Sequence, residues 1–286
     1  MILNKNLEKG VLEKGVFINP RCQFYYNNAP WILDYSSDQQ ATINSVKINS
    51  CQAENYFEGK PPLDMVYWGQ SNEEATKVPN GEIRLKDWIS SNGSDIIFSQ
   101  ENAGLQPSTE TSQNGLKTLN FNNDYLEIPS DLFFLPNGNS TMFIVPKVTA
   151  DDSFNRRFFS LGNGINQRMV VQYSQSTGTI LFGNSNNASV DGVSTTGTLT
   201  NYNIITTIRD GIQQSISLNA GSFISNNNAT SSSDVNGGRL CANSSGTGFT
   251  AICEMAEVII YDRVLSSEDI NQVQIYLSEK WDIGLM

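Results

Sequence analysis

The sequence predicts an all-β protein, folded as a sandwich or barrel, with one helix near its C-terminal end. Asn, Ser, Thr and Gly fill stretches where a helical protein carries Glu, Lys, Ala and Leu, and only 16% of the 286 residues are charged. From about residue 83, short apolar or alternating segments are separated by turn-forming clusters. Residues 266–281 instead show helical spacing of apolar residues.

The predicted strands follow one another at the short, regular spacing of a sandwich or barrel. NG, STG and SNN clusters between them supply residues that adopt positive φ in tight connections. A polar stretch rich in Asn, Ser and Gly, residues 225–248, is predicted to form a loop. The strand segments are EIRLKDWI, SDIIFS, LKTLNF, DYLEIP, TMFIVPKV, RRFFSLG, RMVVQYS, GTILFGN, YNIITTIRDG, QQSISLNAG and FTAICEMAEVIIYDR.

The predicted helix begins with a capping signal. Ser266 can cap its N-terminus, and Asp269 follows three residues later. Apolar residues then recur on one side, so that side is expected to dock on the sandwich. The docking residues expected are Ile270, Val273, Tyr276, Leu277 and Trp281.

Two regions of different composition divide the chain. Residues 1–82 hold five of the nine prolines and the aromatic-rich stretch CQFYYNNAPWILDY, without clear strand alternation. We expect them to form an N-terminal arm or a small docking domain, and residues 83–286 to form the sandwich.

The charged residues exclude several functions. The net charge is −11 and no run of Lys and Arg is present, which excludes the phosphate-neutralising surface that nucleic-acid binding requires. The absence of histidine excludes Ser-His-Asp and Cys-His catalysis and disfavours zinc. No apolar h-region with a cleavage site and no bilayer-length apolar segment occurs, so neither secretion nor membrane insertion is expected.

Cys241 and Cys253 are the cysteines whose state the pattern leaves open. They could face each other as a disulfide, although buried thiols are the expectation that we favour.

Residues 249–283, FTAICEMAEVIIYDRVLSSEDINQVQIYLSEKWDI, resemble the closing signature of laminin G-like, concanavalin A-like jelly rolls. The shared features are the strand AEVIIYDR, the dipeptide LS, and a helix with an acidic start that ends YLSEKWDI. Upstream, LKTLNFNNDYLEIP, STMFIVPKV and RRFFSLGNG resemble earlier strands of the same family. The resemblance covers about residues 83–286 and implies a jelly-roll β-sandwich of two curved antiparallel sheets, a fold used to bind carbohydrate or protein ligands.

The resemblance also suggests a calcium site, because relatives often hold one hard cation at the rim of the sandwich. Asp124 matches the family's acidic position, with Asn122 and Asn123 beside it and the DDS at 151–153 as a further source of oxygen ligands. The alternative is that NFNND forms a turn stabilised by its own side chains. No other cofactor is expected.

Saccharide binding needs an exposed aromatic platform with planar amides around it. Tyr173, Phe182, Asn184 and Asn187 lie in a predicted strand and loop that can offer one. Alternation equally allows the aromatic residues to face the core.

The fold also includes glycoside hydrolases, whose retaining chemistry needs two carboxylates about 5 Å apart. The nearest pair is Glu254 and Glu257. In a regular strand, a separation of three residues places them on opposite faces, so no enzymatic activity is expected.

Relatives of this fold occur in structural proteins of tailed bacteriophages, where no export signal is needed. The first hypothesis is therefore a virion structural protein, a capsid decoration, fibre or tail-tip component exposed on the particle. It would be a homo-oligomer that contacts other virion proteins through its N-terminal region and displays a lectin-like domain toward host-surface glycans. A free carbohydrate-binding lectin is the second hypothesis, and a polysaccharide-degrading enzyme is the third.

Overall fold

The computed structural model describes residues 25–26, 29–30, 64–71, 84–150, 155–163, 166–186, 189–229, 235–244 and 249–286. The chain divides into two units, residues 1–57 and 58–286. In the first unit, β1 (Tyr25–Tyr26) pairs with β2 (Ala29–Pro30). Strand β3 (Tyr67–Gln70) lies in the second unit, before the boundary at residue 83 that the sequence suggested. That the N-terminal region forms an arm or a small docking domain stays a prediction.

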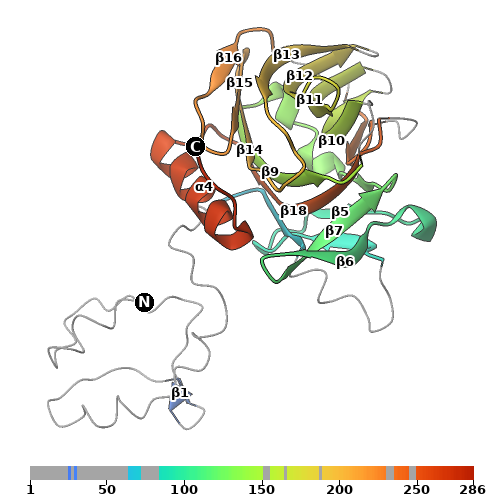
Figure 1. Cartoon of the computed structure of the whole chain (residues 1–286), viewed down its shortest axis with the longest axis vertical. Coiled ribbons are helices and arrows are strands. Elements are labelled where there is room, and N and C mark those ends of the chain that lie inside the picture. The colour runs from blue at the N-terminus through green and yellow to red at the C-terminus, as the bar shows by residue number, and fades with distance from the viewer. Residues whose placement is uncertain are drawn as a thin grey trace, which may run out of the picture. The chain divides into compact units, whose positions relative to one another are not determined.

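The second unit is a sandwich of two antiparallel sheets, which confirms the all-β fold class (Figure 1). The first sheet, here sheet I, has the order β13-β12-β11-β10-β17-β8-β5-β4. Its strands in that order are Ser189–Thr196, Thr179–Asn186, Asn166–Ser174, Asn155–Asn163, Gly237–Leu240, Leu126–Glu127, Ile97–Ser99 and Asp87–Ile89.

The second sheet, here sheet II, has the order β16-β15-β14-β9-β18-β7-β6. Its strands in that order are Ile224–Asn226, Gln213–Leu218, Ile205–Asp210, Ser140–Val148, Ile252–Tyr261, Leu116–Asn122 and Ser108–Gln113. Three short 3-10 helices, η2 (Ala103–Leu105), η3 (Ser130–Leu132) and η4 (Leu135–Asn137), lie in the connections.

The hydrophobic core fills the space between the two sheets, and alternate residues of each strand contribute to it. Sheet I supplies Trp88, Phe159 and Phe182, and sheet II supplies Ile216 and Val258, all at or near complete burial. The other face of sheet II is covered in part by a helix, so side chains on that face are buried without belonging to the core.

Strand β18 is the centre of sheet II. One of its edges pairs with β9 along most of its length. The other edge pairs with β7 at residues 252–255 and with β3 at residues 257–260. The register against β9 shifts between Met255 and Glu257, which marks a β-bulge at Ala256. The Ser71 hydroxyl donates a hydrogen bond of 2.6 Å to the Ala256 carbonyl and thereby satisfies a backbone group at the bulge.

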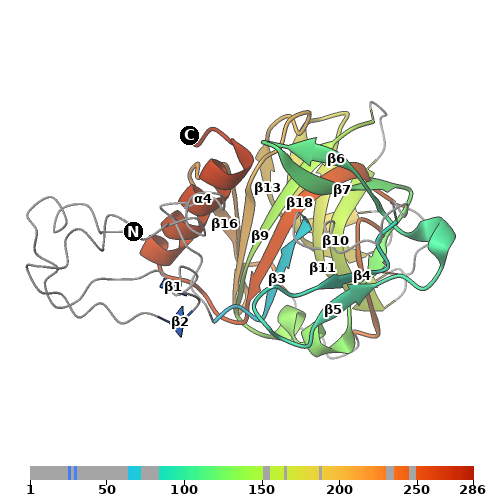
Figure 2. The same ribbon diagram turned by 90° about the horizontal axis from the view of Figure 1, so that it is seen from below.

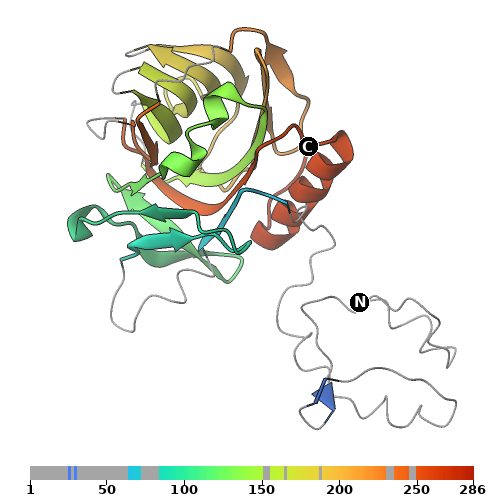
Figure 3. The same cartoon turned by 180° about the vertical axis from the view of Figure 1, so that it is seen from behind.

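Helix α4 (Ser267–Trp281) packs on the outer face of sheet II, beside β9 and β18 (Figure 2). The reverse view shows the same helix outside the sheet (Figure 3). The Ser266 side chain accepts a hydrogen bond of 3.1 Å from the Asp269 amide, which confirms the predicted cap. The expected docking residues, Ile270, Val273, Tyr276, Leu277 and Trp281, are all buried. Of the helices in the described parts of the chain, none is both long and apolar enough to cross a bilayer.

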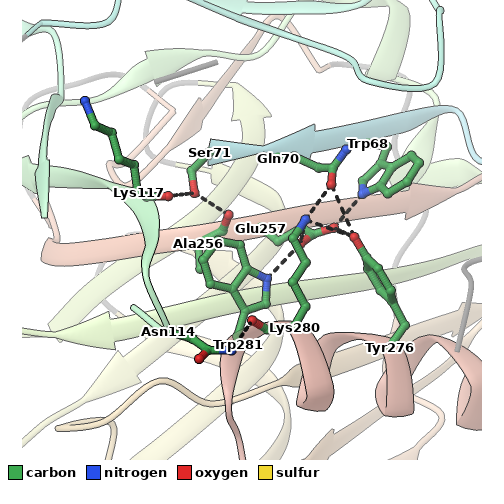
Figure 4. A network of polar contacts seen from close by, with 10 residues as sticks. All are labelled: Trp68, Gln70, Ser71, Asn114, Lys117, Ala256, Glu257, Tyr276, Lys280 and Trp281. Carbon is green, nitrogen blue, oxygen red and sulfur yellow. Dashed lines mark hydrogen bonds and ion pairs between the residues drawn. The ribbon is translucent and has the colours of Figure 1, made fainter. Parts of the chain in front are cut away.

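A buried ion pair joins the helix to the sheet (Figure 4). Glu257 on β18 is fully buried, and one of its carboxylate oxygens lies 2.9 Å from the Lys280 ammonium. The same oxygen accepts a hydrogen bond of 2.7 Å from the Trp281 indole. The other oxygen accepts hydrogen bonds from the Trp68 indole and the Tyr276 phenol. Donors from β3 and α4 therefore surround the carboxylate.

The ammonium of Lys280 is satisfied in the same way. It also donates to the side-chain oxygen of Gln70 on β3 and to the Tyr276 oxygen at 2.9 Å. Taking two charges out of water is unfavourable unless each finds several partners, and here both do.

Removing one of these charges should weaken the fold strongly. We expect Lys280→Met to lower the free energy of unfolding by about 3–5 kcal/mol, because Glu257 is then buried without a counter-charge. The double variant Glu257→Gln/Lys280→Met should lose clearly less free energy of unfolding than Lys280→Met alone. Urea denaturation measures both.

The surface pair Lys86–Glu101 provides the control, since both side chains are half-exposed or more. Lys86→Met should change stability little. Equal losses for Lys280→Met and Lys86→Met would contradict the importance of the buried pair.

Candidate functional site

The aromatic residues proposed to bind saccharide lie in the core instead. Tyr173 is 3% exposed and Phe182 is 0% exposed, and both belong to the apolar cluster between the sheets. Asn184 is also buried, and its side-chain amide lies 3.4 Å from the Asn228 carbonyl that it contacts. Asn187 lies outside the described residues. Tyr173 and Phe182 therefore present no ring face to a ligand, because the strand face that carries them is the inner one.

Asp124, the proposed calcium ligand, is buried and already has partners. Its carboxylate accepts a hydrogen bond of 3.1 Å from the Asn122 amide and pairs with Arg84 at 3.1 Å. Burial raises the pKa of the Asp124 carboxyl, while the Asn122 amide and Arg84 act in the opposite direction. The Asn122 side chain is exposed. Among the described residues, no group of three or more acidic or cysteine side chains forms a metal cluster, and the calcium site stays a prediction.

Cys241 and Cys253 face each other between the sheets as thiols. Their sulfur atoms are 3.4 Å apart, and both residues are fully buried. Burial and the neighbouring Cys253 thiol raise the pKa of Cys241, so it stays protonated and serves as a packing residue rather than a nucleophile.

The bulge in β18 overturns the expected placement of Glu254 and Glu257. Cys253, Met255 and Val258 all point into the core, so the extra residue at the bulge changes the alternation between positions 255 and 258. Glu254 and Glu257 consequently share the outer face of sheet II. The prediction that they lie on opposite faces was wrong, because a bulge inserts one residue into the two-residue period.

Glu254 contacts two side chains of a polar site beside the end of α4. Its carboxylate pairs with Lys147 of β9 at 3.3 Å and accepts a hydrogen bond from the Tyr202 phenol. The Thr118 hydroxyl lies 3.0 Å from the same phenol oxygen. The Lys147 ammonium also lies 5.4 Å from the centre of the Tyr202 ring.

Tyr202 and Lys147 line a cavity of about 410 Å³, a size within the usual range of small-molecule sites. Its wall combines strand β9, the β13–β14 connection, the turn after β15, the β6–β7 hairpin and the residues that follow α4. The lining residues are Gln113, Lys147, Thr198, Asn201, Tyr202, Asn203, Asn219, Asp282, Ile283 and Gly284.

Two of the lining amides hold the wall together. The Asn203 side chain donates to the Asn201 carbonyl at 2.7 Å and accepts from the Asn219 side chain at 2.8 Å. The Asn219 oxygen in turn accepts a hydrogen bond of 2.7 Å from the Ile204 amide. Thr198 and Asn201 are exposed, so their side chains are accessible at the rim. The cavity thus has a fixed wall and accessible polar groups.

The residue after α4 brings a carboxylate to the same cavity. Asp282 ends the helix in the left-handed conformation with φ of 54°, and its amide bonds back to the Ser278 carbonyl. The Gln113 side-chain nitrogen donates to the Trp281 carbonyl at 2.9 Å, which ties the β6–β7 hairpin to the end of the helix.

Sequence reasoning missed this cavity, because its residues come from five separated segments and none forms a motif. The one available signal was the amide and aromatic composition of Asn201, Tyr202 and Asn203, of which Tyr202 and Asn203 were predicted to begin a strand.

No family model and no curated protein matches the chain. Its structure is similar to solved structures of Trypanosoma rangeli sialidase. The complex with the inhibitor DANA has 12% identity and a TM-score of 0.52, covering 74% of this chain and 32% of that chain. The covalent intermediate with 2,3-difluorosialic acid has 13% identity and a TM-score of 0.56. The match covers 78% of this chain and 34% of the sialidase chain. The chain therefore spans about a third of the length of these sialidases, and the likeness establishes the fold.

These comparisons correct two expectations. The chain was interpreted as a virion structural protein without enzymatic activity, and that interpretation is wrong: the similar solved structures are sialidases, which are glycoside hydrolases. The fold is therefore shared with carbohydrate-processing enzymes. The homo-oligomeric state stays a prediction.

The protonation of Tyr202 should be visible in the pH dependence of stability. Burial and the hydrogen bond to Glu254 raise the pKa of this phenol above its ordinary value. The unfolded chain releases the phenol proton near pH 10, whereas the folded chain keeps it, so the free energy of unfolding falls as pH rises above about 10. We expect Tyr202→Phe to lose less stability than the wild type between pH 9 and pH 11 in urea denaturation. Parallel losses would contradict a raised pKa.

Proposed function

We propose that this chain acts in carbohydrate processing and that the cavity at Tyr202 and Asp282 is its saccharide-binding site. The observation that supports this most strongly is the cavity itself, which is polar, preformed and of suitable size. It lies on the outer face of sheet II, away from the apolar core.

The chemistry of the lining suits a sugar ring. Hydroxyl groups of saccharides pair with amides, hydroxyls and carboxylates, and Thr198, Asn201 and Asp282 offer all three kinds at the cavity. Tyr202 adds an aromatic side chain whose position is fixed by Glu254. Because the wall residues are bonded to each other, little conformational freedom is lost on binding.

The fold-level comparisons agree with this proposal. The similar solved structures are of a sialidase, and the resemblance to laminin G-like jelly rolls also implies a fold that binds carbohydrate. Fold similarity alone does not transfer an activity, so the proposal depends on the cavity.

Isothermal titration of the full chain with a panel of monosaccharides and disaccharides tests the binding site. We expect at least one saccharide to bind. Asn201→Ala should lower the affinity for that saccharide by about 3- to 10-fold, as the loss of one hydrogen bond implies. Asn236→Ala removes an exposed amide next to β17 in sheet I and should leave binding unchanged. Absence of binding across the panel, or equal effects of the two variants, would refute the proposal.

A second candidate function, glycoside hydrolysis at the same cavity, is favoured by the Tyr202–Glu254 hydrogen bond. A phenol that donates to a carboxylate has the geometry of a nucleophile beside its base, and sialidases are known to use a tyrosine nucleophile. Asp282 would be the acid, since it is the carboxylate among the lining residues. The low exposure and raised pKa of Tyr202 favour binding over catalysis.

A fluorogenic assay separates the two candidates. Incubation of the chain with 4-methylumbelliferyl glycosides, including the sialoside, should release no fluorophore if the cavity only binds. Turnover that Glu254→Gln abolishes, in a variant that remains folded by circular dichroism, would establish hydrolysis instead.

A further inference from the structure

The side chains around the cavity carry more negative than positive charge, and this excess affects which class of saccharide the cavity binds. Lys147 is the cationic residue among the lining side chains, and its charge is matched by Glu254 at 3.3 Å. Asp282 lines the cavity and forms no ion pair with any residue that the structure describes. The three side chains therefore sum to one negative charge.

The end of helix α4 adds to this negative potential. The carbonyls of its last turn carry the negative end of the helix dipole, equivalent to about half an elementary charge. Lys280 would offset it, but its ammonium is buried and paired with Glu257. The net charge of −11 on the whole chain also acts against anions in solution.

Hydrogen-bond acceptors also accumulate at the same end of the cavity. The nitrogen of the Gln113 amide is engaged by the Trp281 carbonyl, so the amide oxygen is the part left for a ligand. The Asp282 carboxylate accepts and does not donate. A ligand group that donates several hydrogen bonds and carries positive charge fits this end best.

Resting on the proposed function, we propose that the cavity selects an amino sugar. Its protonated amino group would lie against Asp282 and the Gln113 oxygen, and its hydroxyls would face Thr198 and Asn201. Neutral sugars bind less tightly, and acidic sugars bind least tightly. Asp282 repels the carboxylate of an acidic sugar, and Lys147 is already paired with Glu254.

Titration of the full chain with glucosamine, N-acetylglucosamine and N-acetylneuraminic acid at pH 6.5 and low salt tests this order. We expect glucosamine to bind most tightly. The difference in affinity between glucosamine and the other sugars should shrink in 0.5 M salt, because the Debye length of exposed charges is then about 4 Å. N-acetylglucosamine is the matched ligand, since acetylation removes the charge and keeps the ring.

Asp282→Asn identifies the residue responsible. Asn adopts the left-handed conformation as readily as Asp, so the helix end is kept. We expect this variant to bind glucosamine about 2- to 5-fold more weakly and to bind N-acetylglucosamine with unchanged affinity. Asp262→Asn is the control, because it removes an equal exposed charge beyond the other end of α4, about 22 Å away along a 15-residue helix.

Three outcomes are distinct. Binding of N-acetylneuraminic acid as tight as that of glucosamine would overturn the amino-sugar proposal and leave saccharide binding intact. An equal effect of Asp282→Asn and Asp262→Asn on glucosamine would also overturn it, because the preference would then come from overall charge. Failure of all three sugars, and of the wider panel, would refute the binding site itself.

Discussion

The bulge in β18 is the constraint on which the outer face of the sandwich depends. By inserting one residue between Met255 and Glu257, it places Glu254 and Glu257 on the same side of sheet II, both directed away from the core. Glu257 then anchors helix α4 through Lys280, and Glu254 fixes Lys147 and Tyr202 at the cavity. One backbone irregularity thus links the docking of the helix to the formation of the site.

The two carboxylates have different surroundings and therefore different roles. Glu257 is fully buried and receives donors from β3 and α4, which makes it structural. Glu254 is 7% exposed and its partner Lys147 reaches the cavity. The helix that Glu257 holds ends at Asp282, so the ion pair under the helix also determines where the carboxylate that lines the cavity lies.

Much of the fold could be predicted from the sequence. Alternating apolar segments and turn clusters indicated the strands, and the pair Ser266 and Asp269 indicated the start of the helix. The site could not be predicted in the same way. Alternation does not say which face of a strand is the inner one, so Tyr173 and Phe182 were candidates for a surface that they do not reach.

Two further features form no sequence motif. The bulge occurs in CEMAEVII, a segment with the composition of a regular strand, and it is visible only in the pairing with β9, a strand more than 100 residues earlier in the sequence. The cavity brings together segments that are far apart in the sequence, and only the sheet order places them side by side.

The central claim is that saccharide binds in the cavity at the end of α4. Amide chemical-shift mapping by NMR during titration with glucosamine tests it most directly. The account predicts that the largest shifts occur at Asn201, Tyr202, Asn203 and the residues from Asp282 to Gly284. Shifts confined to sheet I, or no shifts with glucosamine or with any other sugar of the panel, would contradict it.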